Sequence, residues 1–230
     1  MNPSVKKTIT DSRRLGWIPE PLAKDLLQVY GLSTSHFVWA KSIEEALSGA
    51  QEVGYPLVAK VVSPAIIHKS DVGGVVVGVR DDEHLKEVFR QFRKLPRFDG
   101  ILLDEMLEGV EVIIGSQNDP QFGTVVLIGI GGTAVEIYRD VAIRMAPLSP
   151  KAALNAIHSL TGAALLKGYR GDKAVNLNKL KNLLVQFSRM AYQLREEVSS
   201  IDLNPVLCTD RKAVVADARF ILKEESAQKS

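Results

Sequence analysis

Two strand-forming runs near the C-terminus, joined by a short polar turn, constrain the fold of this chain more than any other segment. The runs are residues 201–205 and 214–219, with the turn at 210–211. Asp202 and Asn204 are two residues apart on the first run, so both side chains leave the same face of a strand. In this register Asn204 faces Asp217, and opposed Cβ atoms on paired strands are about 4.5–5.5 Å apart. The hairpin therefore predicts either a magnesium site built from side-chain oxygens or an ordinary hairpin whose polar face meets water.

The composition is that of an ordinary globular protein. The 230 residues are 46% hydrophobic, which is enough for one large domain or two smaller lobes with buried cores. The 29 basic and 27 acidic residues leave a net charge of +2, so the overall field favours neither nucleic acid nor an anionic membrane as a partner. A single cysteine, Cys208, excludes an intramolecular disulfide. With no apolar leader and no run of about 18 apolar residues, a cytoplasmic protein is expected.

The expected boundaries divide the chain into four parts. Residues 1–16 carry four basic side chains and few large apolar ones, so we expect a flexible arm, with order beginning near Trp17. Residues 17–103 are expected to form a first α+β lobe and residues 104–223 a second lobe that ends in the hairpin. Residues 224–230 are expected to be a solvated tail.

Hydrophobic patterning predicts alternating helices and strands in the first lobe and mainly strands in the second. In the first lobe the predicted helices are 19–30, 42–53 and 81–94, and the predicted strands are 57–62, 74–79 and 100–105. In the second lobe the predicted strands are 110–116, 124–130, 134–137 and 141–146, followed by a helix whose apolar positions step by three and four from 177 to 198. The long helix is expected to cover an antiparallel sheet. The fold class is therefore α+β.

Lys60 lies inside the apolar run 57–62, where an ammonium group is costly to bury without an anionic partner. One interpretation is that this lysine binds a phosphate. The other is a lysine at the end of a strand whose stem lets the charge reach water.

A polar loop that ends in two glycines, residues 68–74, follows the same strand and reads His-Lys-Ser-Asp-Val-Gly-Gly. Backbone amides around Ser70, Gly73 and Gly74 can cradle phosphate oxygens, although the loop matches neither the phosphate-loop nor the dinucleotide pattern. His68 is a candidate nucleophile, because a neutral imidazole can attack phosphorus and hold a phosphoryl group covalently. The alternative is a surface histidine in an ordinary turn.

Acidic residues follow the strand 100–105, where the two lobes are expected to join. Glu105 and Leu107 lie at this hinge, and a hinge can present backbone groups to the edge of a nucleotide base. Glu111 follows on the next predicted strand. The alternative, favoured if no nucleotide binds, is that both glutamates are simply exposed to solvent.

A second glycine cluster lies at residues 129–132 and is followed by Glu136, Arg139 and Arg144. Backbone donors and guanidinium groups together can bind phosphates or a carboxylate, which makes Arg139 a catalytic candidate. A glycine-rich turn with surface arginines is the alternative.

Taken together and in this order, these motifs resemble an ATP-grasp domain. They are most similar to the β subunit of the ADP-forming acetyl-CoA synthetases, also called acetate–CoA ligases (ADP-forming), which are relatives of succinyl-CoA synthetase. The residues that carry the resemblance are Val58-Ala59-Lys60, the block from Ser63 to Gly74, Asp104-Glu105, Gly109-Val110-Glu111, the glycine turn at 131–133, Ile201-Asp202-Leu203-Asn204-Pro205 and Asp217-Ala218-Arg219. The resemblance covers nearly the whole chain, and the block from Ser63 to Gly74 is its most specific part.

The resemblance implies a fold of two lobes that clamp a nucleotide, and the reaction acyl-CoA + ADP + phosphate ⇌ acid + CoA + ATP through an acyl phosphate and phosphohistidine. It also implies a role for each candidate. Phosphates are held by Lys60, Ser70, Gly73 and Gly74, the adenine by Glu105 and Leu107, the ribose or phosphate region by Glu111, and Mg²⁺ by Asn204, Asp217 and Asp202. His68 relays the phosphoryl group, with Lys60 and Arg139 as further catalytic residues.

The family also needs a CoA-binding domain and a ligase domain with its own phosphohistidine, for which 230 residues leave no room. The resemblance therefore implies a separate α subunit, most simply in an α₂β₂ assembly, which handles CoA and the acyl group. No nucleic acid or membrane partner is expected. Two alternatives stay open: a stand-alone ATP-grasp ligase that joins a carboxylate to an amine, and a nucleotide-sensing module without catalysis.

Overall fold

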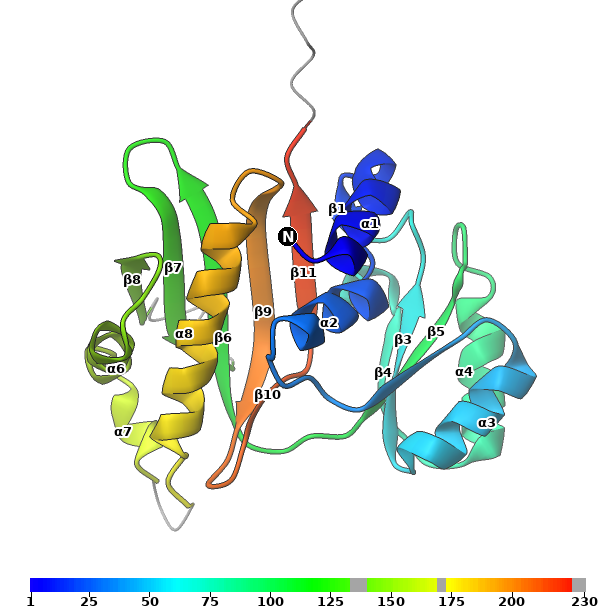
Figure 1. Ribbon diagram of the computed structural model, residues 1–230. Helices are drawn as coiled ribbons and strands as arrows, with labels where there is room; N and C mark the ends of the chain where they lie inside the picture. Colours follow the sequence, from blue (N-terminus) through cyan, green and yellow to red (C-terminus); the bar gives the residue numbers. More distant parts are fainter. Residues whose placement is uncertain (133–139, 169–172, 225–230) are drawn as a thin grey trace, which may run out of the picture. The chain divides into compact units, whose positions relative to one another are not determined.

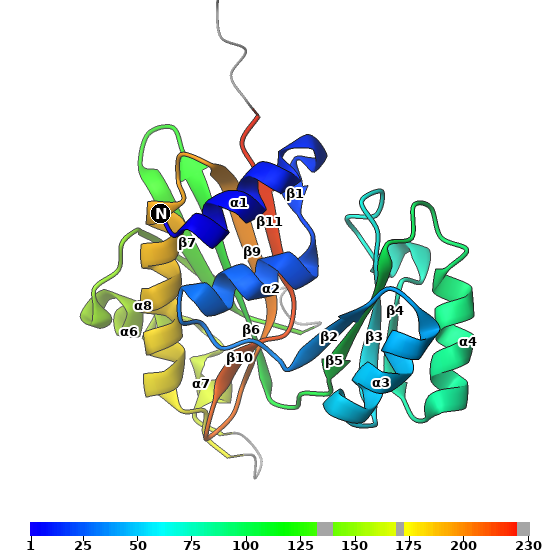
Figure 2. The same cartoon turned by 45° about the vertical axis from the view of Figure 1, so that its right-hand side comes forward.

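The computed structural model describes residues 1–132, 140–168 and 173–224, which fold into two units (Figures 1 and 2). Unit 1 contains Met1–Ile18, Leu22–Thr34 and the chain from Glu108 onward, and unit 2 contains Pro19–Pro21 and Ser35–Leu107. The expected division into 17–103 and 104–223 differs from this grouping. The reason is that Ala23, Leu26 and Leu27 are buried in the core of unit 1, although the chain around them precedes unit 2.

Unit 1 is built on an antiparallel sheet, whose described strands have the order β1-β11-β9-β6-β7-β8, with β10 paired to β9. The strands are β1 (Trp17–Ile18), β6 (Val110–Asp119), β7 (Gly123–Ile130), β8 (Val141–Met145), β9 (Val198–Cys208), β10 (Ala213–Val215) and β11 (Ala218–Leu222). Burial alternates along β11, where Ala218, Phe220 and Leu222 are buried. One face of the sheet therefore meets the core, and the other carries polar residues on β9, such as Asn204, and exposed apolar residues on β8, such as Ile143 and Met145. The predicted strand at 134–137 lies outside the described residues.

The core face of this sheet is covered by helices of the same unit. They are α1 (Pro3–Ser12), α2 (Glu20–Val29, in unit 1 from Leu22), α6 (Pro150–His158), α7 (Ala163–Leu166) and α8 (Leu177–Gln193). Helix α8 crosses the sheet (Figure 1) and buries Leu180, Leu184 and Phe187, as its stripe predicts. It ends earlier than expected, because β9 already begins at Val198. No helix in the described part of the chain is both long and apolar enough to cross a membrane.

The first sixteen residues differ from the expected flexible arm. Asn2 caps helix α1 by accepting the Ser4 N–H at 2.9 Å, and Val5 and Ile9 are buried in the core of unit 1. The chain continues through the 3₁₀ turn η1 (Arg13–Leu15), where Arg13 pairs with Glu197. Large apolar residues are few in this segment, but Val5 and Ile9 are four residues apart and form a buried stripe on one face of the helix.

Unit 2 is a four-stranded antiparallel sheet with the order β2-β5-β3-β4 in the described residues. Its elements are β2 (Phe37–Ala40), α3 (Ile43–Val53), β3 (Leu57–Val62), the 3₁₀ turn η2 (Ser70–Val72), β4 (Val75–Val79), α4 (Asp82–Phe92) and β5 (Gly100–Glu105). Helices α3 and α4 pack on the sheet and on each other (Figure 2). Ser42 caps α3 and Asp81 caps α4 through their side-chain oxygens. Strand β2 was not among the predicted elements.

The C-terminal hairpin has the predicted register. Leu203 pairs with Ala218 and Cys208 pairs with Ala213, which places Asn204 opposite Asp217. The predicted second strand, 214–219, is split into β10 and β11, and the intervening residues still follow the hairpin, since Asn204 N donates to Asp217 O at 3.2 Å. The face that carries these two residues is the one away from the helices.

Replacing Ile9 with alanine tests whether α1 belongs to the folded unit. Because Ile9 is 2% exposed, Ile9→Ala is expected to lower the free energy of unfolding by about 2–5 kcal/mol, as deletion of a buried aliphatic side chain usually does. The measurement is urea unfolding followed by circular dichroism. The control is Thr10→Ala on the exposed side of the same helix, expected within about 0.5 kcal/mol of the parent. Equal effects of the two substitutions would contradict a packed α1.

Candidate functional site

Lys60 is buried in the middle of the unit 2 sheet. It lies on β3 between β5 and β4, and only 6% of the residue is exposed. Its Nζ is 2.5 Å from Glu20 Oε1 and 3.0 Å from Asp104 Oδ2, and both carboxylates are also buried. A buried ammonium is tolerated only beside anions, which these two residues supply. The interpretation of Lys60 as a strand-end lysine that reaches water is therefore wrong.

The charges around Lys60 form a cluster of four residues, which we call the ion cluster: Glu20, Lys60, Lys69 and Asp104. Glu20 Oε2 is 2.7 Å from Lys69 Nζ, so one carboxylate binds two lysines through its two oxygens. On the other side, Asp104 Oδ1 accepts the hydroxyl hydrogen of Ser35 at 2.8 Å. Among these four side chains the two positive and two negative formal charges cancel, which lowers the cost of burying Glu20, Lys60 and Asp104.

The loop between β3 and β4 begins at Ser63 and is closed by backbone bonds to Lys69. The Lys69 carbonyl accepts the Gly74 N–H at 2.7 Å and the Val72 N–H at 3.3 Å. Gly73 has a left-handed backbone (φ +66°), and a Cβ at Gly74 would lie 2.9 Å from the Lys69 carbonyl oxygen, so both glycines are needed for this turn. His68, next to Lys69, is exposed. The structure thus places an accessible imidazole beside a firmly held lysine.

The hinge residues occupy the end of β5. Glu105 Oε1 accepts the His36 N–H at 2.9 Å, and Glu105 N donates to the His36 carbonyl at the same distance. The carboxylate therefore closes the end of the β2–β5 pair. Leu107 follows two residues later and is half-buried. The predicted contacts of Glu105 and Leu107 with adenine remain predictions.

The polar face of the hairpin in unit 1 brings together the predicted oxygen ligands. Asn204 is exposed and lies opposite Asp217, while Leu203 between Asn204 and Asp202 is buried. Asp202 Oδ2 is 3.3 Å from Arg219 Nη2 on the neighbouring strand. Burial raises the pKa of Asp202, and the Arg219 guanidinium partly opposes this rise. Asp202 is thus paired with a protein cation, and its role as a third or water-mediated metal ligand stays a prediction.

These donors fit a hard divalent cation. In the described part of the chain no three His, Cys, Asp or Glu side chains are grouped so as to hold a metal. The hairpin instead offers an amide oxygen and a carboxylate at Asn204 and Asp217. Mg²⁺ usually takes only one or two carboxylates from the protein and completes its shell with water and substrate phosphates. The donor set therefore suits Mg²⁺ bound together with a nucleotide.

The second glycine cluster lies against Glu111. The Glu111 carbonyl accepts the Gly131 N–H at 2.6 Å, and Glu111 Oε2 is 3.7 Å from the position of a Cβ at Gly132. Arg144 donates to the Ile143 carbonyl and to the Ser159 hydroxyl, so its guanidinium braces its own unit. Arg139 and Glu136 lie outside the described residues, and the catalytic role of Arg139 stays a prediction.

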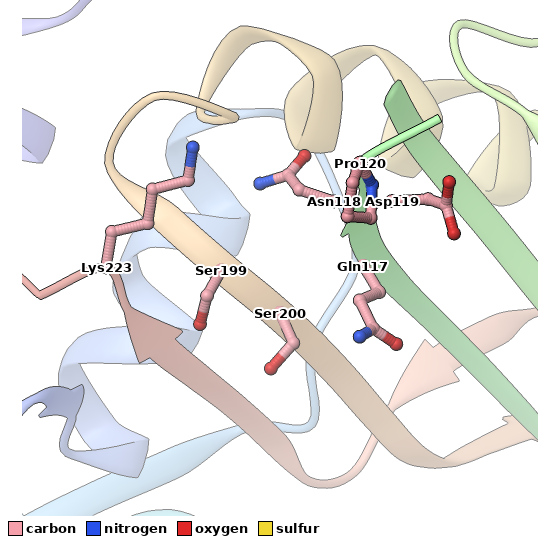
Figure 3. Close-up of a pocket in the computed structure, with 7 residues that line it drawn as sticks. All are labelled: Gln117, Asn118, Asp119, Pro120, Ser199, Ser200 and Lys223. Carbon is pink, nitrogen blue, oxygen red and sulfur yellow. The ribbon is translucent and has the colours of Figure 1, made fainter. Parts of the chain in front are cut away.

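A separate hollow of about 440 Å³ lies at the end of β6 and the start of β9 (Figure 3). It is lined by Gln117, Asn118, Asp119, Pro120, Ser199, Ser200 and Lys223. Its polar groups stabilise local structure: Asn118 donates to the carbonyls of Arg195 and Val198, and Asp119 caps the following turn. It contains none of the candidates predicted from the sequence.

Three members of the ion cluster, Glu20, Lys69 and Asp104, were not predicted as site residues, although Lys69 lies inside the predicted 68–74 loop. Glu20 stands between two prolines at the start of α2 and looks like an ordinary acidic residue of a first helical turn. Asp104 precedes Glu105 in one of the motifs that carry the resemblance, which implies no role for Asp104. The available signal was the position of Lys60 in an apolar strand, because a buried ammonium needs carboxylate partners. Sequence spacing does not identify which carboxylates these are.

Comparison with known proteins places this geometry in a family. A family model described as an ATP-grasp domain matches residues 10–222. The chain is 41% identical over 211 residues to acetate–CoA ligase (ADP-forming) I subunit beta of Pyrococcus furiosus, a match that covers 88% of this chain and 90% of the relative.

Solved structures agree. Acetyl-coenzyme A synthetase 1 of Ca. Korarchaeum cryptofilum, in complex with coenzyme A and Ca-AMPCP, aligns with a TM-score of 0.88 and 38% identity over 95% of this chain and 99% of that one. The same enzyme with coenzyme A and Mg-AMPPCP, described with its phosphohistidine segment pointing towards the nucleotide-binding site, aligns with a TM-score of 0.83 and 35% identity over the same shares.

The fold and the family match define an ATP-grasp protein, which confirms the expected fold class. More closely, the chain belongs to the family of β subunits of ADP-forming acetate–CoA ligases, as the resemblance of its motifs predicts.

Proposed function

We propose that this chain is the nucleotide-handling β subunit of an enzyme that interconverts acyl-CoA, ADP and phosphate with the free acid, CoA and ATP. The observation that carries the proposal is an exposed His68 beside a half-buried, ion-paired Lys69, in a chain 41% identical to an ADP-forming acetate–CoA ligase β subunit. A solved relative has a phosphohistidine segment that points towards its nucleotide-binding site. Phosphate carried on histidine is therefore part of that relative's chemistry.

The proposed step transfers a phosphoryl group between His68 and ADP. In the direction of ATP synthesis, a terminal oxygen of ADP attacks the phosphorus on His68. The new P–O bond forms as the N–P bond breaks, and the ring nitrogen keeps the electron pair. In the reverse direction the unprotonated nitrogen of a neutral imidazole attacks the γ-phosphorus of ATP, and ADP leaves with the bridging oxygen.

The proposed phosphate contacts come from Lys60 and from the loop residues Ser70, Gly73 and Gly74. Two carboxylates hold the Lys60 ammonium in place, so its position does not depend on substrate. Phosphoryl transfer needs positioning and charge neutralisation more than covalent help from the protein, and a prepositioned cation meets both needs. We further propose that Glu105 and Leu107 contact the base, that Glu111 contacts the ribose or phosphates, and that Arg139 assists catalysis.

We propose Mg²⁺ as the metal, with Asn204 and Asp217 as its protein ligands. One relative has been solved with both magnesium and calcium nucleotide analogues, and the hairpin oxygens suit such an ion. A bound ion would neutralise phosphate charge. Asp202, which is paired with Arg219, is proposed to act through water or to orient the neighbouring ligands.

The proposed partner is an α subunit that carries the CoA-binding and ligase domains, because the curated relative is named as a beta subunit. An α₂β₂ assembly and a cytoplasmic location are further proposals. The two alternatives, a carboxylate–amine ligase and a sensing module without catalysis, are not favoured, since the relatives are CoA ligases and a sensor has no use for phosphohistidine.

Replacing His68 tests the relay. In the enzyme assembled with its α subunit, His68→Ala is expected to reduce ATP formation from acyl-CoA, ADP and phosphate by on the order of 10³-fold or more, because the variant has no nitrogen to carry the phosphoryl group. Coupled spectrophotometry measures the rate. The matched control is His158→Ala, another exposed histidine at the end of α6, expected to act at the parent rate. An undiminished rate with His68→Ala would exclude the relay.

Replacing Asp217 tests the metal ligands. Asp217→Asn is expected to raise the Mg²⁺ concentration needed for half-maximal ADP binding about tenfold, because one anionic ligand becomes neutral; this equals about 1.4 kcal/mol. Calorimetric titration of ADP at a series of Mg²⁺ concentrations measures the shift. Asp210→Asn, in the exposed turn of the same hairpin, serves as control. Identical Mg²⁺ dependence in both variants would count against the hairpin as the metal site.

A further inference from the structure

Lys69 is anchored twice in unit 2, through its side chain and through its backbone. Its ammonium lies 2.7 Å from Glu20 Oε2, with 12% of the lysine side chain and 1% of the glutamate side chain exposed. Its carbonyl accepts the Gly74 and Val72 N–H groups. A long flexible side chain loses much conformational entropy when it is fixed in this way, and a buried carboxylate offsets that cost.

A second anchor lies on the other side of His68. Ile66 is 6% exposed and packs in the core of unit 2, while Ser63 holds the start of the loop by donating to the Pro96 carbonyl at 2.6 Å. Between the two anchors lie Ile67, which is 40% exposed, and the exposed His68. The imidazole thus projects from a segment of two residues whose ends are both held.

Glu20 connects this segment to the lysine on β3. Its Oε1 binds Lys60 and its Oε2 binds Lys69, so both lysines are set by a single buried carboxylate. Consecutive Cα atoms are about 3.8 Å apart, so a shift of Lys69 moves the backbone of His68 with it. Loss of the Glu20–Lys69 pair would remove the side-chain anchor of the residue that directly follows His68 in the loop.

From this arrangement we infer that Glu20 and Lys69 are positioning residues for His68. They hold the imidazole at a fixed distance from the phosphates bound near Lys60, and they do so without contacting the reacting atoms. The inference rests on the proposed relay through His68. A misplacement of about 1 Å can reduce the rate of a transfer reaction about 100-fold, so breaking the tether should slow transfer while leaving nucleotide binding largely intact.

A purely structural role for the pair makes a different prediction. Breaking a buried ion pair lowers stability whether or not the pair guides catalysis. The test therefore needs a rate measured at saturating nucleotide, a separate measurement of nucleotide affinity, and a variant that restores the pairing.

The experiment uses the enzyme assembled with its α subunit, γ-labelled ATP and Mg²⁺, and rapid quenching in base. Lys69→Met is expected to transfer label to His68 at least about tenfold more slowly than the parent at saturating ATP, with the ATP dissociation constant changed by less than about threefold. Lys69→Arg keeps the charge and can reach Glu20, so it should recover most of the rate. Lys86→Met, which breaks a surface pair with Glu83, is the control and should match the parent.

The outcomes separate this inference from the proposed function. Parent-like transfer by Lys69→Met, or equal losses in the Met and Arg variants, would overturn the positioning role. Absence of label on His68 in the parent would overturn the relay itself and the positioning role with it. If Lys69→Met folds poorly, the charge-balanced double variant Glu20→Gln with Lys69→Met keeps the Lys60–Asp104 pair and should show the same slow transfer; parent-like transfer by it would also overturn the inference.

Discussion

A lysine buried in the middle of a sheet requires negative charge within a few ångströms, and much of unit 2 is arranged around that requirement. Lys60 obtains the charge from Glu20 at the start of α2 and from Asp104 on β5. Glu20 then has a second oxygen to satisfy, and Lys69 provides the matching cation. The ion cluster thereby links two strands, the first turn of a helix and the His68 loop in one neutral group. Removing any member leaves an uncompensated charge in the interior, which is costly.

In the hairpin of unit 1, strand pairing and the alternation of side chains are enough to arrange the polar residues. Alternation along β9 and β11 buries one set of residues and exposes the other, and the pairing of Leu203 with Ala218 places Asn204 opposite Asp217. Arg219 holds Asp202 beside them and limits the negative charge on this face. The remaining oxygens suit one small cation with its own water and phosphate ligands. Unit 1 thus carries the proposed metal ligands, and unit 2 by itself carries the two lysines and His68.

Local sequence patterns predicted the parts of the fold that local physics determines. The bounds of β3 and β5 match the predicted strands, and the hairpin register follows from its turn and alternation. The predictions were wrong where contacts between residues far apart in the sequence determine the structure. Val5 and Ile9 form a buried stripe in a segment whose basic residues favoured a flexible arm. The residues from Leu22 to Thr34 belong to unit 1, together with the chain from Glu108 onward. Glu20 is forty positions from Lys60, and no spacing rule connects them. Motif resemblance, not patterning, supplied the nucleotide and the phosphohistidine chemistry.

The central claim is that this chain carries a phosphoryl group on His68 during turnover. Mass spectrometry of the assembled parent enzyme, sampled during ATP synthesis and quenched in base, tests it most directly. The account predicts a base-stable, acid-labile phosphate on His68 that forms and decays at least as fast as ATP appears. Steady ATP synthesis with no phosphate on this chain at any time would contradict it.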